Sequence, residues 1–254
     1  MWPRSASTSW IPASGAGCSE RKPILGVEGA GRVLSVGEGV EDFQAGERVV
    51  WVYAPGSYAS RAVIPAAALV PVPDAIDDRT AASVMMQGLT ASHFATDFYP
   101  VQPGEFALVH AAAGGLGLLL TQIIKIRGGK RLSAGCSSQE KVGIAREAGA
   151  DHVIVDAGSN FAEEAVRLAD GEGVHVAYDG TGPVSWKASL DALRRCGTLC
   201  WFGPILGGPG PVEITSIPKS IKIGYAVFAA STRWPTPPVP MPTWKAERRP
   251  VNFC

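Results

Sequence analysis

The sequence lacks a long apolar run, an excess of one charge and a basic stripe. A helix that crosses a bilayer needs about 20 consecutive apolar residues, and the longest apolar helical stretch is interrupted by Thr121 and Gln122. The 23 basic residues balance the 23 acidic ones, and no stripe of lysine and arginine carries interleaved aromatic residues. Without an excess of positive charge, the chain has no broad electrostatic field that would attract the phosphate backbone of a nucleic acid. We therefore expect neither a membrane role nor nucleic-acid binding.

Cysteine and histidine are scarce and show no metal-ligand pattern. The five cysteines are odd in number, have no framework spacing and follow no signal-like segment, which favours free thiols in a reducing cytoplasm. Cys196 and Cys200 are four residues apart, but the residues around them indicate a turn that leads into a strand. The chain has four histidines, none of which has a second ligand at zinc-site spacing: His93, His110, His152 and His175. We predict no bound metal and place His110 and His152 at core or edge positions.

The order of apolar runs predicts two different halves. From Phe106 to Phe228, short apolar runs alternate with segments of helical spacing, which is typical of repeated βα units and of a six-stranded parallel sheet. From Val27 to Val72, short valine-rich runs are separated by turns that contain Gly, Pro and Asp, which indicates antiparallel strands. Asp77 to Phe98 shows helical spacing and connects the halves. The expected fold class is α/β, a doubly wound parallel sheet with a β-rich second part.

A glycine-rich turn follows the first apolar run of the parallel half. It reads Ala112-Ala113-Gly114-Gly115-Leu116-Gly117 and leads into a helix with apolar residues at i, i+3 and i+4. Gly114 would let the backbone approach a pyrophosphate, and Gly117 would let the helix pack against the strand. The helix N-terminus adds unpaired N–H groups and the positive end of its dipole. Taken alone, such a turn also serves as a plain connection, or binds another nucleotide such as S-adenosylmethionine.

A longer pattern surrounds this turn. Gly104-Glu105, Leu108, the glycine-rich turn, Gln122 and Lys125 follow one another at fixed offsets. With them, the sequence resembles the quinone oxidoreductase/zeta-crystallin group of the medium-chain dehydrogenase/reductase superfamily. The resemblance runs roughly from Pro23 to Phe228 and includes Gly26–Val33, Gly46–Val49, Gly88–Ala91, Ala148–Ile154, Tyr178–Gly182 and Phe202-Gly203. It implies a Rossmann domain and a GroES-like substrate domain that is incomplete here.

The resemblance divides the chain into four expected segments. Residues 1–22 form an irregular segment outside the family pattern, and residues 23–100 form a partial GroES-like domain with its connecting helix. Residues 101–229 form the Rossmann dinucleotide-binding domain, and residues 230–254 form a proline-rich irregular tail. We interpret the two end segments as the result of truncation or a shifted reading frame.

The segment after the second strand of the parallel half distinguishes NADPH from NADH. NAD-specific Rossmann folds place an acidic residue there to bind the ribose 2′-OH, but Ala134 to Ser138 contains no carboxylate. Lys141 follows one turn later and can reach a 2′-phosphate, with Ser137 and Ser138 as further donors, although Ser137 is equally explained as a helix cap. The sequence therefore predicts NADPH. The expected cofactor-binding residues, several placed by the resemblance, are Ala113, Gly114, Gly115, Leu116, Gly117, Gly135, Cys136, Ser137, Ser138, Lys141, Gly180, Thr181, Gly182, Phe202 and Gly203.

The resemblance also implies chemistry without zinc. Zinc-dependent relatives carry a His-Glu pair where this chain has Val27-Glu28, and a four-cysteine lobe that has no counterpart here. A quinone that accepts hydride becomes a phenolate-like anion that water can protonate, so the protein needs to supply orientation but no strong general acid. We assign no catalytic residue. The resemblance places Tyr53, Gln87 and Thr90 in the substrate cleft, and Tyr53 is equally explained as a packed strand aromatic.

Three functions remain open on the sequence. The first is an NADPH-dependent quinone reductase, the second an enoyl reductase of the same superfamily, and the third a catalytically impaired NADPH-binding fragment. The expected partner is a small quinone or enone. An edge strand from Ile221 to Phe228 would also allow a homodimer.

Overall fold

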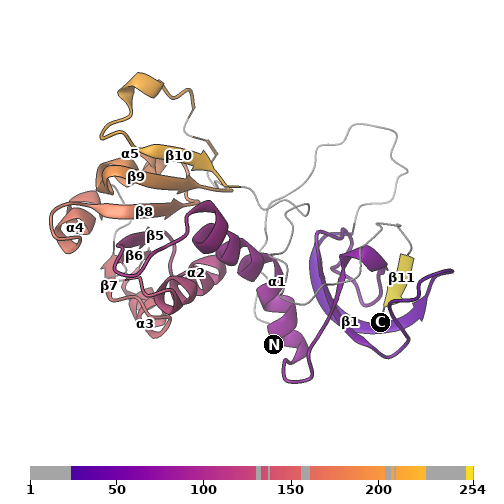
Figure 1. Cartoon of the computed structure of the whole chain (residues 1–254). Coiled ribbons are helices and arrows are strands. Elements are labelled where there is room, and N and C mark those ends of the chain that lie inside the picture. The colour runs from indigo at the N-terminus through magenta and orange to yellow at the C-terminus, as the bar shows by residue number, and fades with distance from the viewer. Residues whose placement is uncertain are drawn as a thin grey trace.

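A computed structural model describes residues 24–129, 133–136, 138–155, 161–203, 207–208, 210–226 and 250–253. The described chain has two sheets, one parallel and one antiparallel, and the long helix α1 (Asp78–His93) runs between them (Figure 1). None of the helices in this part of the chain combines the length and the apolar character that a bilayer crossing requires.

The parallel sheet has the six strands that the sequence predicts. They are β5 (Ala107–Val109), β6 (Ser133–Cys136), β7 (His152–Val155), β8 (Val174–Asp179), β9 (Leu193–Trp201) and β10 (Lys222–Tyr225). Their order is β10-β9-β8-β5-β6-β7, and every neighbouring pair is parallel. The strand order reverses at β5, whose neighbours β6 and β8 lead away in opposite directions. In open α/β sheets a ligand binds in the crevice at this reversal, outside the carboxyl ends of the strands.

Helices cover both faces of the parallel sheet, as expected for a doubly wound fold. One face carries α1, α2 (Gly115–Ile126) and α3 (Val142–Glu147), which follows the 3-10 turn η3 (Gln139–Lys141). The other face carries α4 (Phe161–Leu168) and α5 (Pro183–Ala192). In α2 the spacing of Leu120 and Ile124 turns both side chains into the core, where they are fully buried. Apolar burial of this kind is the main stabilising term for both layers.

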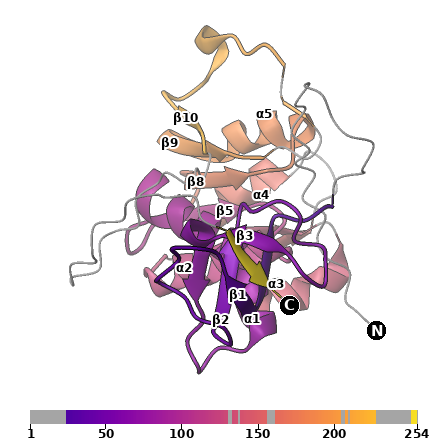
Figure 2. The same ribbon diagram turned by 90° about the vertical axis from the view of Figure 1, so that its right-hand side faces the viewer.

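The antiparallel sheet confirms the β-rich character of residues 27–72. It contains β1 (Glu28–Val36), β2 (Arg48–Val52), β3 (Val63–Pro65) and β4 (Leu69–Pro71), with a 3-10 turn η1 (Ala66–Ala68) before β4. Its fully buried side chains include Val33, Val49 and Ile64, which pack with Trp51 and Phe43. In the view of Figure 2 the antiparallel sheet lies in front of the part of the molecule that carries α2 and α3, whereas α4 and α5 lie above it.

The strand β11 (Pro250–Phe253) differs from the expected irregular tail. It lies between β1 and β3 and pairs antiparallel with both, for example Val251 with Val36 and with Ile64. The physical reason is that the edge of β1 exposes a row of backbone N–H and C=O groups, and a short segment of the same chain satisfies them. Pro250 fits because it is the first residue of the strand, where no ladder donor is required. Residues 1–23 and the remainder of the tail lie outside the described residues.

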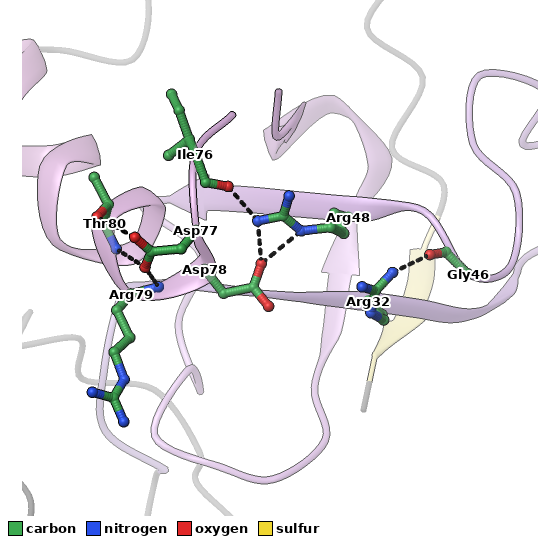
Figure 3. A network of polar contacts seen from close by, with 8 residues as sticks. All are labelled: Arg32, Gly46, Arg48, Ile76, Asp77, Asp78, Arg79 and Thr80. Atoms are coloured by element: carbon green, nitrogen blue, oxygen red, sulfur yellow. Dashed lines mark hydrogen bonds and ion pairs between the residues drawn. The ribbon is translucent and has the colours of Figure 1, made fainter. Parts of the chain in front are cut away.

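The start of α1 is tied to the antiparallel sheet. Asp77 caps the helix, and its carboxylate accepts hydrogen bonds from the backbone N–H groups of Arg79 at 2.9 Å and Thr80 at 3.0 Å. Arg48 of β2 donates to Asp78 Oδ1 from Nε at 2.8 Å and from Nη2 at 2.7 Å (Figure 3). Arg48 Nη2 also donates to the backbone carbonyl of Ile76. These contacts of Arg48 therefore attach the first residues of the connecting helix to β2. At its other end it continues into the π-helical turn η2 (Phe94–Phe98), which packs on the parallel sheet.

Candidate cofactor site

The glycine-rich turn joins β5 to α2, as the sequence predicts. His110 follows β5, and its backbone N–H donates to the carbonyl of Tyr178 at 3.0 Å. Ala111 then adopts a positive φ of 51°, and its carbonyl accepts the N–H of Gly114 at 2.8 Å. Gly114 is the N-cap residue of α2. The chain thus reverses within a few residues and directs the N-terminus of α2 toward the carboxyl edge of the sheet.

The glycines of this turn meet different surroundings. Gly117 is buried, and a Cβ there would lie 2.7 Å from the Ala112 Cα, so the helix approaches the strand only because this residue has no side chain. Gly114 is exposed, and the nearest protein atom to an added Cβ is the Ala111 carbonyl oxygen at 3.1 Å. Open space in front of Gly114, combined with unpaired N–H groups in the first turn of a helix, suits a phosphate. The turn therefore fits the pyrophosphate of a dinucleotide.

Gln87 of α1 covers Gly115, the first residue of α2. A Cβ on Gly115 would lie 2.6 Å from Gln87 Cδ and 2.8 Å from Gln87 Nε2. The connecting helix therefore places a carboxamide, with both a donor and an acceptor, beside the phosphate turn. This contact places one of the expected cleft residues next to one of the expected cofactor residues.

The end of β6 lies next to the same turn. The Cys136 side chain is buried, and its thiol donates a hydrogen bond to the backbone carbonyl of Lys141 at 3.9 Å. Burial raises the pKa of the Cys136 thiol, while the Ala113 N–H and the nearby Lys141 ammonium oppose the shift. Lys141, in η3, is exposed and its backbone N–H donates to the carbonyl of Ser138 at 3.2 Å. Gly135 precedes Cys136 in β6 and pairs with Ile154, whereas Ser137 lies outside the described residues.

The ends of β8 and β9 bring the remaining expected cofactor residues together. Asp179 pairs with Trp201, and its carbonyl accepts the N–H of Phe202 at 3.1 Å. Gly180 lies directly against the Phe202 ring, because an added Cβ would be 2.9 Å from its Cδ2 atom. The turn at Thr181 and Gly182 and the positive-φ residue Gly203 follow these strands. All these segments leave the carboxyl edge of adjacent strands, and their residues together form a candidate dinucleotide site at the reversal of strand order.

The expected cleft residues have distinct environments. Tyr53 has a positive φ of 61° and is 40% exposed, so a large side chain is held in a backbone conformation that costs roughly 1–3 kcal/mol. Thr90 Oγ1 donates at 2.6 Å to the carbonyl of Met86 within its own helix. Such strain at a partly exposed tyrosine supports the interpretation of Tyr53 as a cleft residue over that of a packed strand aromatic.

Glu28 is a candidate residue that the sequence interpretation mentioned only as the second residue of Val27-Glu28, where zinc-dependent relatives carry a His-Glu pair. Its Oε2 accepts the backbone N–H of Met86 at 3.1 Å, which joins β1 to the middle of α1. Burial raises the pKa of the Glu28 carboxyl, and the Met86 hydrogen bond opposes this effect. Burial first, and then the Glu28 charge, also raise the pKa of Tyr53, so the two side chains are electrostatic neighbours. The signal in the sequence that could have identified Glu28 as a site residue is its position as a carboxyl residue directly after Gly26-Val27.

Metal ligands do not gather in the described part of the chain. No group of three His, Cys, Asp or Glu side chains in it could hold a metal ion. The absence of zinc from the reaction stays a prediction.

Comparison with known proteins decides the family. Residues 10–74 match the family model of the alcohol dehydrogenase GroES-like domain, and residues 115–237 match that of the zinc-binding dehydrogenases. A quinone oxidoreductase of Pseudomonas aeruginosa is 40% identical over 189 residues, which cover 74% of this chain and 57% of that protein. The chain belongs to the medium-chain dehydrogenase/reductase superfamily. The fold class and the family predicted from the sequence are thereby confirmed.

Two further relatives, both reductases by name, are similar to the chain over comparable lengths. A 2-haloacrylate reductase of Burkholderia sp is 35% identical over 75% of this chain and 58% of that protein. The solved structure of Escherichia coli quinone oxidoreductase complexed with NADPH matches with a TM-score of 0.76 and 34% identity, over 80% of this chain and 63% of that one. The chain thus spans under two thirds of the length of these relatives.

Proposed function

We propose that this chain is an NADPH-dependent quinone reductase that transfers hydride without zinc. The observation that carries the proposal is the turn from Ala111 to Gly117, where one glycine is required for packing and another leaves space for a phosphate. The relatives named quinone oxidoreductase, one of them in complex with NADPH, support it.

The preference for NADPH is supported by the charges around the end of β6. Lys141 is exposed and lies near Cys136, beside the expected ribose site, and Ser138 adds a hydroxyl. The residues from Ser133 to Cys136 contain no carboxylate that would accept a hydrogen bond from a ribose 2′-OH. A cation with neutral donors favours a 2′-phosphate over a 2′-OH.

The protein's part in the reaction is binding and orientation. Bound NADPH would supply the hydride. The α2 N-terminus and Gly114 would hold the pyrophosphate, and Gly180 to Gly182 with Phe202 would border the nicotinamide. Phe202 packs on Phe94 with ring centroids 4.8 Å apart, which backs this wall with apolar side chains and limits water.

An enone is the second substrate class that an observation supports. Its reduction requires a proton at carbon after hydride transfer, which a quinone does not require. Tyr53 is partly exposed, and its hydroxyl is protonated at neutral pH, as in any tyrosine; burial and then Glu28 raise its pKa further. A retained phenolic O–H can donate a hydrogen bond or a proton to such a substrate.

Steady-state assays with both substrate classes test the proposal. We expect p-benzoquinone to oxidise NADPH faster than NADH, and a metal chelator to leave the rate unchanged. If 2-cyclohexenone is reduced faster than p-benzoquinone, the enone is favoured. In that case Tyr53→Phe should lose the reduction of 2-cyclohexenone but keep that of p-benzoquinone. Binding of NADPH without turnover of either substrate would instead identify a catalytically impaired nucleotide-binding protein, and activity lost on chelation would contradict the zinc-independent mechanism.

We also propose a cytoplasmic setting and a homodimer. Cys136, Cys196 and Cys200 are free thiols, as a reducing compartment would keep them. The edge strand β10 of the parallel sheet leaves one side open, with Tyr225 57% exposed. An unpaired edge is a template for a second copy of the chain. Light scattering after size exclusion should report twice the chain mass. Tyr225→Lys, which places a charge at the exposed edge, should reduce the reported mass to that of one chain.

A further inference from the structure

A buried polar network lies behind the candidate cofactor site. His110 Nε2 is 2.9 Å from Ser189 Oγ, and Ser189 Oγ donates to Asp179 Oδ2 at 2.6 Å. The other carboxylate oxygen, Asp179 Oδ1, accepts the backbone N–H of Thr181 and the hydroxyl of Ser185, both at 2.9 Å. Asp179 and Ser189 are fully buried, and the side chain of His110 is 10% exposed. A carboxylate this far from water persists only with several donors.

The direction of the hydrogen bonds follows from the available protons. The single proton of the Ser189 hydroxyl points to Asp179, so His110 Nε2–H must be the donor to Ser189 Oγ. His110 therefore has its proton on Nε2, and the chain of bonds runs from His110 through Ser189 to Asp179. Because Asp179 Oδ2 is also 3.8 Å from His110 Nε2, the central hydroxyl holds two otherwise separate groups together.

The two ends of this network belong to different parts of the site. His110 is the residue between β5 and the glycine-rich turn, directly before the positive-φ residue Ala111. Thr181 lies in the turn between β8 and α5, next to Gly182 with its φ of 131°. Ser185 strengthens the second end, because its hydroxyl also contacts the Gly182 carbonyl at 3.1 Å.

We propose that His110, Ser189 and Asp179 are positioning residues that hold the phosphate turn and the Gly180–Gly182 turn in one fixed relative arrangement. The inference rests on the proposed function, because the two turns are those assigned to the pyrophosphate and the nicotinamide. None of the three side chains touches the cofactor in this assignment. Their effect is to preorganise two backbone segments, so that a dinucleotide meets both without a further ordering cost.

Hydrogen exchange of the protein without cofactor tests the coupling directly. Ser189→Ala removes the central hydroxyl and should speed exchange of amides in both segments 110–117 and 179–186. Ser185→Ala leaves the link to His110 intact and should speed exchange only in 179–186. Thr121→Val is the control, because Thr121 Oγ1 is a buried hydroxyl without a partner among the described residues. Faster exchange in only one segment for Ser189→Ala, or evenly along the chain, would overturn the coupling.

Binding affinities then separate the two turns. Adenosine 2′,5′-bisphosphate carries the 2′-phosphate and the first phosphate but no nicotinamide. We expect Ser185→Ala to weaken NADPH binding about tenfold and leave the bisphosphate unchanged, and Ser189→Ala to weaken both about tenfold, the scale of one lost charged hydrogen bond. If Ser185→Ala and Ser189→Ala weaken the binding of NADPH and of the bisphosphate to the same extent, the network stabilises the fold in general and does not position the two turns, which would overturn the proposal. Failure of the unaltered protein to bind NADPH would overturn the proposed function, while the exchange result would still decide the coupling.

Discussion

Gly117, in the first turn of α2, lies so close to Ala111 that an added Cβ would overlap the Ala111 carbonyl oxygen. Gly117→Ala must therefore move the helix away from the strand, an overpacking that costs about 1–3 kcal/mol. We expect a lower free energy of unfolding in urea titrations. Gly143→Ala is the control, because an added Cβ there meets nothing within 4 Å and a helical alanine stabilises. Unchanged stability of Gly117→Ala would show that α2 can shift without cost.

Gly114→Ala should separate folding from binding at the same turn. Gly114 has φ −85° and ψ 166°, which any residue adopts, and an added Cβ would meet within 4 Å only the Ala111 carbonyl oxygen, at a tight 3.1 Å. We expect a loss of stability smaller than that of Gly117→Ala and a loss of NADPH affinity of tenfold or more, because the methyl group would occupy the place of the phosphate. Calorimetric titration measures this. Full affinity in a folded Gly114→Ala protein would mean that the turn is only a connection.

Lys141→Ala should reduce the preference for NADPH over NADH. We expect NADPH affinity to fall by about 1.5–3 kcal/mol, the range for a hydrogen bond to a charged group, with NADH affinity unchanged. Lys187→Ala is the matched control, because that lysine is 87% exposed and pairs with Asp191 on α5. Equal affinities for both cofactors in the unaltered protein would contradict the assignment of Lys141.

Stability should fall in mild acid because of His110. Burial lowers the pKa of His110, and the nearby Asp179 opposes this effect only in part. The unfolded chain therefore takes up a proton at about pH 6.5, while the folded protein does so only at lower pH. This contribution to stability is fully present above about pH 6.5 and is lost as the pH falls through the folded pKa, with a slope of up to about 1.4 kcal/mol per pH unit.

The variant His110→Gln keeps an N–H donor near Ser189 but cannot titrate. Urea titrations between pH 5 and 8, a range of about one and a half units on either side of the histidine pKa, should show a smaller loss for this variant than for the unaltered protein. His175 also has its pKa lowered, by burial and by Arg194, and contributes equally to both proteins. Identical pH slopes would exclude His110 as the titrating group.

Arg48→Lys should weaken the start of α1. Lysine cannot make the forked contact that Arg48 makes with Asp78 and the Ile76 carbonyl (Figure 3). Because Asp78 is half exposed, we expect a loss of only about 1 kcal/mol in thermal or urea unfolding. Arg79→Lys is the control, since the Arg79 side chain points away from this network (Figure 3). A loss in the control as large as in Arg48→Lys would indicate a general charge effect.

The sequence by itself determined the parallel half of the fold. The apolar period of α2 and the runs at β5, β7 and β8 predict the elements within a few residues, because period and turn residues are local properties. The same local character made the strand–turn–helix unit at Gly114 to Gly117 visible, and with it the expected cofactor edge.

Only the tertiary structure decided the contacts between distant segments. Nothing local in Pro250–Phe253 indicates that it pairs with β1 and β3, because a strand partner is chosen by an open edge elsewhere in the chain. The contact of Gln87 with Gly115 joins two helices. The network joins His110 to Asp179, which lies 69 positions later in the chain, and it forms because the ends of β5 and β8 are adjacent. The apolar pattern of the sequence determines which residues are buried. Which buried polar side chains become hydrogen-bond partners depends on which helices and strands come into contact, and those contacts depend on the whole fold.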